Sequence, residues 1–268
     1  EGRPALCGTG AASNTAGALT GGHRRIFRGG NPINHHMGCS AFADHAVVSR
    51  NSLVKVDPEL PLEEAALFGC AVLTGVGAVV NTAKAPMGAT VAVVGLGGVG
   101  LAALLGAVAS GASRIVAVDL ARDKRDFAMT RGATDAFDAA APNAIEAIRE
   151  ATNGGLDHAL EFAGSVKAMD LAYRITRRGG TAVTAGLPHP TATFALPQTH
   201  LVAEERTVKG SYIGTCVPAR DLPRYVSLYR QGKLPVDTLL THRLKLADIN
   251  EGFERLRTGR AVRQVVTF

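Results

Sequence analysis

From residue 90 onward, short apolar runs alternate with segments of helical character. The apolar runs lie at 90–94, 114–118, 135–138, 158–162, 180–186 and 207–213. The helical segments between them lie at 99–110, 122–131, 143–152 and 166–177. Strands without in–out alternation are buried on both faces, so the pattern predicts a parallel sheet with helices on each side. We therefore expect an α/β fold of the doubly wound kind.

The segments before and after this region carry weaker signals. Gly, Pro, Asn and His cluster at 21–38 and predict a loop. Alternating residues at 40–49, followed by 53–56, predict short antiparallel strands. We expect two helices, one over 61–67 and one over 74–83, the first because Pro61 is followed by two acidic residues. After residue 213, the predicted elements are helix 221–231, strand 239–244, helix 246–257 and strand 263–268.

A glycine-rich segment follows the strand at 90–94 and opens the next helix. It matches G-x-G-x-x-G, and Asp119 ends the following strand nineteen residues after Gly100. This context predicts a dinucleotide site: Gly95 permits a tight turn, Gly97 lets a pyrophosphate approach the backbone, and Gly100 lets the helix pack on the strand. Asp119 can accept hydrogen bonds from a ribose and repel a 2′-phosphate, which favours NAD over NADP. The predicted loop residues are Gly95, Leu96, Gly97, Gly98, Val99 and Gly100.

Two other interpretations of this segment stay open. A glycine-rich turn can occur in an α/β domain that binds no ligand. A methyltransferase can use the same topology for S-adenosylmethionine, although its loop more often spaces glycines at every second position.

Composition and charge narrow the function classes. The chain has 268 residues, 46% of them apolar and 19% charged, which excludes a disordered chain. The net charge is +6, but no run of five basic residues occurs, so we expect no nucleic-acid binding. No window resembles a transmembrane span or a signal peptide, so we expect no membrane association. Four scattered cysteines predict a reduced, cytoplasmic protein without a disulfide framework.

Several separated motifs resemble the zinc-containing medium-chain alcohol dehydrogenases. They are Gly69-Cys-Ala-Val-Leu-Thr-Gly-Val-Gly77, Val93-Val-Gly-Leu-Gly-Gly-Val-Gly100, Val118-Asp-Leu-Ala-Arg-Asp-Lys124 and the ending Leu256-Arg-Thr-Gly-Arg-Ala-Val-Arg-Gln-Val-Val-Thr-Phe268. The resemblance implies a Rossmann domain inserted in a β-rich, chaperonin-ten-like catalytic domain. Accordingly, we expect a catalytic-domain remnant at 1–71, the NAD-binding domain at 72–213 and the C-terminal part of the catalytic domain at 214–268.

The resemblance also implies roles for five residues. Cys70 matches a catalytic zinc ligand, and Cys7 matches the last of four cysteines in a structural zinc lobe. Thr74 matches a residue beside the nicotinamide, Lys124 one near the adenosine ribose, and Arg263 one that reaches the cofactor phosphates. Each has a plainer alternative: a buried or isolated thiol for the cysteines, a threonine bonded to its own helix, a solvated lysine and a surface arginine.

The same resemblance implies that the other zinc ligands and the proton relay precede Cys7 in the family. With a start at Glu1 that is not Met, these absences predict an N-terminally truncated chain without catalytic residues of its own. We expect it to bind NAD weakly, hold little zinc, lack turnover and tend to aggregate.

For the intact protein, we expect a homodimer or homotetramer that uses zinc and NAD to interconvert a small alcohol with its aldehyde or ketone. The alternatives are a zinc-free, NADPH-dependent quinone or enoyl reductase of the same superfamily, and a non-catalytic dinucleotide-binding module.

Overall fold

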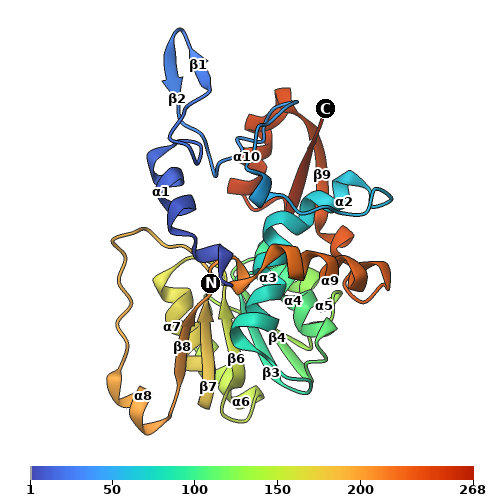
Figure 1. Ribbon diagram of the computed structural model, residues 1–268. Coiled ribbons are helices and arrows are strands. Elements are labelled where there is room, and N and C mark those ends of the chain that lie inside the picture. Colours follow the sequence, from blue (N-terminus) through green and yellow to red (C-terminus); the bar gives the residue numbers. More distant parts are fainter. Residues whose placement is uncertain (1) are drawn as a thin grey trace.

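The computed structural model describes residues 2–268, so Glu1 lies outside the described residues. Six parallel strands form one sheet in the order β5-β4-β3-β6-β7-β8 (Figure 1). They are β3 (Thr90–Val94), β4 (Arg114–Asp119), β5 (Asp135–Asp138), β6 (Leu156–Glu161), β7 (Thr176–Thr184) and β8 (Thr207–Gly210). The predicted parallel sheet is confirmed. Its order reverses between β3 and β6, which is where open α/β sheets bind ligands.

Helices cover both faces of this sheet. They are α4 (Gly98–Ala109), α5 (Arg122–Met129), α6 (Ala144–Ala151) and α7 (Val166–Ile175). Successive residues of β3 point to opposite faces, and the hydrophobic core divides accordingly. Val91 and Val93 pack in one cluster with α4, whereas Ala92 and Val94 pack in another with α6 and α7. Burial on both faces explains why the central strands are continuously apolar.

The residues from 62 to 83 form one continuous helical run rather than the two helices expected from the sequence. It comprises α2 (Leu62–Leu67), η3 (Phe68–Val72), α3 (Leu73–Gly77) and η4 (Ala78–Ala83), of which η3 and η4 are π-helical. By length and composition the run could cross a membrane, which differs from our expectation that no window would qualify. However, 61% of its apolar window is buried inside the chain. At Gly75 an added Cβ would lie 2.3 Å from the Val99 carbonyl oxygen, so the run packs tightly on α4.

The N-terminal segment differs from the sequence prediction. The strands expected at 40–49 and 53–56 do not form. Both segments are largely exposed coil, and η2 (Arg50–Ser52) lies between them. Alternation stabilises a strand only where a neighbouring strand completes the hydrogen bonds, and these segments pair with no strand among residues 2–268. Instead, an antiparallel hairpin of β1 (Ile26–Arg28) and β2 (Asn31–Ile33) lies inside the predicted loop. Two further elements precede it, η1 (Pro4–Leu6) and α1 (Gly8–Ala16).

The C-terminal residues form a small β-α-β unit. The order is α9 (Pro218–Arg230), η6 (Val236–Leu239), β9 (Leu240–Lys245), η7 (Leu246–Asp248), α10 (Ile249–Arg257) and β10 (Arg263–Thr267), with β9 and β10 parallel. Upstream, α8 (Gln198–Ala203) and η5 (Ile213–Thr215) flank β8, which ends at Gly210 rather than at the predicted residue 213. Both chain ends lie above the sheet (Figure 1), and the rings of Phe42 and Phe253 meet edge to face there at 6.0 Å. The three-part domain division stays a prediction.

Candidate dinucleotide-binding site

The glycine-rich loop joins β3 to α4 at the point where the strand order reverses. Gly95 has φ +93°, and an added Cβ would lie 2.7 Å from the Ala163 nitrogen. At Gly100 an added Cβ would lie 1.8 Å from the Gly95 carbonyl oxygen, because the helix starts directly on the strand. Gly97 has no heavy atom within 4 Å of such a Cβ, so its outer face is open. The loop thus presents a helix N-terminus, a favourable place for an anion, on an unobstructed side.

Asp119 ends β4 beside this loop. Its Oδ2 accepts a hydrogen bond from the Leu96 N–H at 2.6 Å, and its Oδ1 accepts one from the Ala121 N–H at 2.9 Å. These bonds fix the carboxylate at the rim of a cavity of about 550 Å³. The cavity, called here the adenosine-side cavity, is lined by residues that include Gly95, Asp119, Leu120, Ala163, Ser165 and Lys167.

Arg263 approaches the loop from the other end of the chain. Arg263 is the first residue of β10, and the pairing of β10 with β9 is irregular directly after it, where β9 has one extra residue. An added Cβ on Gly98 would lie 2.2 Å from the Arg263 Nε, so the guanidinium rests on the loop. That Nε is buried and has no hydrogen-bond partner in residues 2–268. Burial lowers the pKa of Arg263, and the electrostatic effect of Cys70 opposes this shift. A half-buried guanidinium whose Nε has no hydrogen-bond partner favours an anionic ligand at this place.

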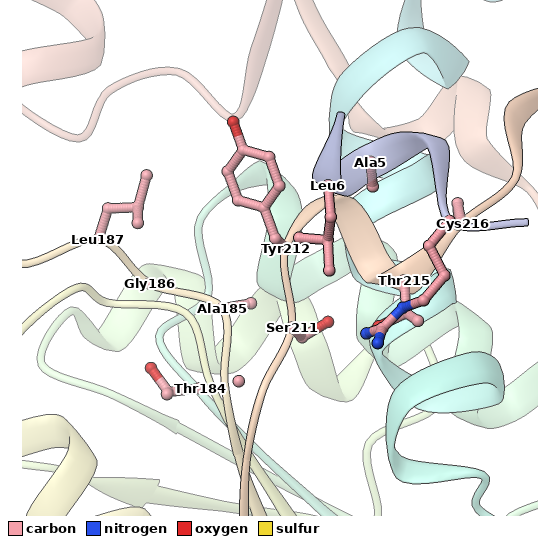
Figure 2. A pocket seen from close by; sticks show the side chains of 12 residues that line it. Ala5, Leu6, Thr184, Ala185, Gly186, Leu187, Ser211, Tyr212, Thr215 and Cys216 are labelled. Carbon is pink, nitrogen blue, oxygen red and sulfur yellow. The ribbon is translucent and has the colours of Figure 1, made fainter. Parts of the chain in front are cut away.

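A second cavity of about 410 Å³ lies at the carboxyl ends of β7 and β8. Figure 2 shows Thr184, Leu187 and Tyr212 around it, with Leu6 of the N-terminal segment on its other side. Arg3 also lines it. Thr74 lies in α3, which packs against η5 at the edge of this cavity: an added Cβ on Gly214 would lie 2.9 Å from the Thr74 carbonyl oxygen. We call this the β7–β8 cavity.

The two predicted zinc ligands, Cys70 of a catalytic site and Cys7 of a structural site, lie at separate elements. Cys70 is exposed in η3, and Cys7 is exposed at the N-cap of α1, where its sulfur accepts a hydrogen bond from Gly10. Within residues 2–268 no three His, Cys, Asp or Glu side chains are grouped to hold a metal ion. A tetrahedral zinc site needs at least three protein ligands, so these residues do not fit a zinc ion on their own.

Lys124 points toward the loop that precedes β10. Its Nζ would lie 3.6 Å from a Cβ added to Gly259. This places Lys124 between α5 and the C-terminal unit, and its role near a ribose stays a prediction.

Sequence reasoning missed the residues that follow β6 and β7. Ala163, Ser165 and Lys167 line the adenosine-side cavity, and Thr184 with Leu187 lines the other one. Their position at or just after the ends of buried strands could have indicated them, since the carboxyl ends of parallel strands share one edge of the sheet.

Known proteins resemble this chain both in sequence and in fold. The family model described as "Zinc-binding dehydrogenase" matches residues 98–231, half of the chain. Alcohol dehydrogenase 1 of Zea luxurians is 39% identical over 236 residues, which are 87% of this chain and 80% of that protein. The chain belongs to the zinc-binding dehydrogenase family. The resemblance to zinc-containing medium-chain alcohol dehydrogenases is thus confirmed.

Two further alcohol dehydrogenases align with most of this chain and are longer than it. Alcohol dehydrogenase 1 of Zea mays is 38% identical over 251 residues, and an alcohol dehydrogenase of Malus domestica is 39% identical over 253 residues. Each alignment covers 92% of this chain and 66% of the relative. The chain therefore spans just under two thirds of these members of the zinc-binding dehydrogenase family.

Solved structures agree with the fold. An alcohol dehydrogenase zinc-binding domain protein from Burkholderia ambifaria matches with a TM-score of 0.93 and 31% identity, over 100% of this chain and 72% of that one. Benzyl alcohol dehydrogenase from Acinetobacter calcoaceticus matches with a TM-score of 0.86 and 30% identity, over 98% of this chain and 74% of that one. These matches confirm the predicted Rossmann-type parallel sheet of this family member.

Proposed function

We propose that this chain is the NAD-binding part of an alcohol dehydrogenase that transfers hydride between a small alcohol and NAD. The observation that carries the proposal is the unpartnered, buried Nε of Arg263 resting on Gly98 at the N-terminus of α4. A phosphate there would pair with the guanidinium and with the helix N-terminus together. The named alcohol dehydrogenase relatives support the alcohol as substrate class.

The two cavities and the loop between them suit the three parts of a dinucleotide. The adenosine would occupy the cavity beside Asp119, whose carboxylate can accept hydrogen bonds from the ribose hydroxyls. The pyrophosphate would meet the open face of Gly97 and the Arg263 guanidinium. The nicotinamide would enter the β7–β8 cavity, which Leu6 and Leu187 help to line. When bound, NAD supplies the hydride acceptor.

We propose zinc as a cofactor only together with ligands that the described residues do not supply. Cys70 would supply one sulfur ligand from the exposed side of η3. The described residues hold no set of three ligands, so a zinc ion would need ligands beyond them. A cytoplasmic location and a homodimeric or homotetrameric assembly also stay proposals.

The experiment that tests the proposal is a titration of the chain with NADH and NADPH, followed by fluorescence. Asp119 would lie near the 2′ position, and like charges about 4 Å apart repel by roughly 4 kcal/mol at an effective dielectric constant of 20. We therefore expect up to about a thousandfold preference for NADH, and Asp119→Ser should remove most of it. Preferred binding of NADPH by the wild type would favour the quinone or enoyl reductase alternative. Absence of binding to either cofactor would contradict the proposal.

A further inference from the structure

Glu161, the last residue of β6, is a buried acidic residue between the two cavities. Its side chain is 1% exposed, and no Lys, Arg or His of residues 2–268 forms a salt bridge with it. One carboxylate oxygen, Oε1, accepts a hydrogen bond from the Gly164 N–H at 2.5 Å. The other, Oε2, accepts one from the Thr184 hydroxyl at 2.7 Å. The two oxygens therefore reach two different segments of the chain.

The backbone of the same residue repeats this bridge. The Glu161 carbonyl oxygen accepts hydrogen bonds from the N–H groups of Ala185 at 2.9 Å and Gly186 at 3.2 Å. The turn after β6 and the segment after β7 are then in direct contact: an added Cβ on Gly186 would lie 2.3 Å from the Gly164 nitrogen. The same Cβ would lie 2.8 Å from Oε1 of Glu161. The spacing between the two segments is thus set by backbone contact and by one carboxylate.

Each bridged segment is the wall of a different cavity. The turn after β6 supplies Ala163 and Ser165 to the adenosine-side cavity. The end of β7 and the segment after it supply Thr184 and Leu187 to the β7–β8 cavity, as Figure 2 shows. Displacement of one segment against the other would change the distance between the two cavities while leaving each of them formed.

We propose that Glu161 is a positioning residue that fixes the separation of the two half-sites and so matches it to the length of a dinucleotide. This inference rests on the proposed function, since it assumes that one ligand spans both cavities. A ligand joined across two sites gains affinity only when both are held at the matching distance. Loss of the bridge should therefore weaken the whole dinucleotide much more than a ligand of one cavity alone.

The test compares NADH with AMP, which occupies only the adenosine side. Glu161→Met keeps the side-chain length but removes both acceptors, so we expect the Kd for NADH to rise about tenfold or more and that for AMP to change less than about twofold. Thr184→Val removes one of the two bonds and should give a smaller change in the same direction. Glu161→Gln can still accept from Gly164 and donate to Thr184, so it should bind both ligands nearly as the wild type does.

A matched control separates positioning from general stability. The Thr176 hydroxyl donates a buried hydrogen bond to the Ala172 carbonyl oxygen at 2.8 Å, at the other end of the same strand. Thr176→Val should lower the melting temperature as Thr184→Val does, yet leave the NADH affinity unchanged. Calorimetry with both ligands and thermal melts of each variant supply these readouts. If Glu161→Met does not fold, Thr184→Val compared with Thr184→Ser, which keeps the donating hydroxyl at the cavity wall, carries the comparison.

Two results would overturn the inference while leaving the proposed function intact. One is an equal loss of NADH and AMP affinity in Glu161→Met and Thr184→Val, which would confine Glu161 to the adenosine side. The other is unchanged NADH affinity in both folded variants. A wild-type chain that binds neither ligand would instead overturn the proposed function, and this inference with it.

Discussion

At the scale of single residues, the glycines of the loop differ in what surrounds them. An added Cβ would meet backbone at Gly100, the Arg263 side chain at Gly98 and open space at Gly97. The same chemical change at three neighbouring positions should thus have three different effects. Overpacking against backbone costs about 1–3 kcal/mol, so Gly100→Ala should destabilise the fold, whereas Gly97→Ala should not.

Gly98→Ala should act on binding rather than on folding. The added methyl group displaces the Arg263 guanidinium, which can move because it ends a flexible side chain. We expect the free energy of unfolding to change by less than about 1 kcal/mol. The Kd for NADH should rise about tenfold, the loss of one charge-assisted contact.

A double-mutant cycle checks the cause of this effect. If Gly98→Ala acts through Arg263, it should have no further effect on NADH binding in an Arg263→Ala background. NADH fluorescence titrations and thermal melts of the two single variants and the double variant give the comparison. Additive effects on affinity would show that the methyl group obstructs the cofactor directly.

At the scale of elements, a bidentate ion pair clamps two neighbouring strands. Arg114 at the start of β4 donates from Nε and Nη2 to both carboxylate oxygens of Asp135 in β5, at 2.8 and 2.7 Å. The Arg114 guanidinium holds the pKa of Asp135 below its ordinary value of 3.8, while partial burial opposes this shift. Because β5 is an edge strand, β4 is its one neighbour in the sheet, and this clamp adds to the pairing between them.

The clamp should give a defined pH dependence of stability. The pKa of Asp135 is lowered in the folded state, so its stabilising effect is complete above the unfolded value and is lost as the pH falls below about 4. We expect Asp135→Asn to cost about 1 kcal/mol at pH 6, because the pair is partly exposed, and progressively less toward pH 3. Urea unfolding at several pH values measures this.

The exposed pair of Asp170 and Arg174 in α7 provides the control for this clamp. It is an i,i+4 pair on the helix surface, so Asp170→Asn should change the free energy of unfolding by less than about 0.5 kcal/mol. A cost of Asp135→Asn that stays constant down to pH 3 would show that the lost interaction is not the ion pair.

At the scale of the whole molecule, residues 42–63 contact residues 230–253. Salt bridges of Glu63 with Arg243 and of Asp57 with Arg230 join them, in addition to the Phe42–Phe253 contact. Apolar side chains stay exposed in this part of the molecule, among them Phe27 at 60% and Val47 at 81%. The parallel sheet and its helices thus bury their apolar side chains, whereas this outer part leaves apolar surface uncovered.

We expect this chain to bind a dinucleotide but to hold little metal. The purified 268-residue chain should contain well under one equivalent of zinc and show no oxidation of ethanol or benzyl alcohol, because no three-ligand group exists in residues 2–268. Metal analysis and a turnover assay with NAD measure this, beside an NADH titration of the same sample. Stoichiometric zinc that is lost in Cys70→Ser would reveal a ligand set that this structure does not bring together.

The amino-acid sequence by itself determined the parallel α/β fold. This fold follows from local features, each of which depends on residues close together in the chain. They are the continuous apolar strands, the small-residue helices and the glycine loop that joins a predicted strand to a predicted helix. For the same reason Gly95, Gly100 and Asp119 could be predicted, since their positions are set by one βαβ unit. The strands expected at 40–49 were wrong because alternation alone does not supply a pairing partner.

Only the tertiary structure decided what depends on distant parts of the chain. Arg263 meets Gly98 across 165 positions because the pairing of β10 with β9 holds the C-terminal residues over the loop. Glu161 joins the ends of two strands because parallel pairing aligns them, and the carboxylate fills space that glycines leave. Such contacts leave no periodic signal, since a single side chain makes each of them. The local pattern therefore specified where a dinucleotide would bind, and the packing of remote segments decided which charges and which spacing it would meet.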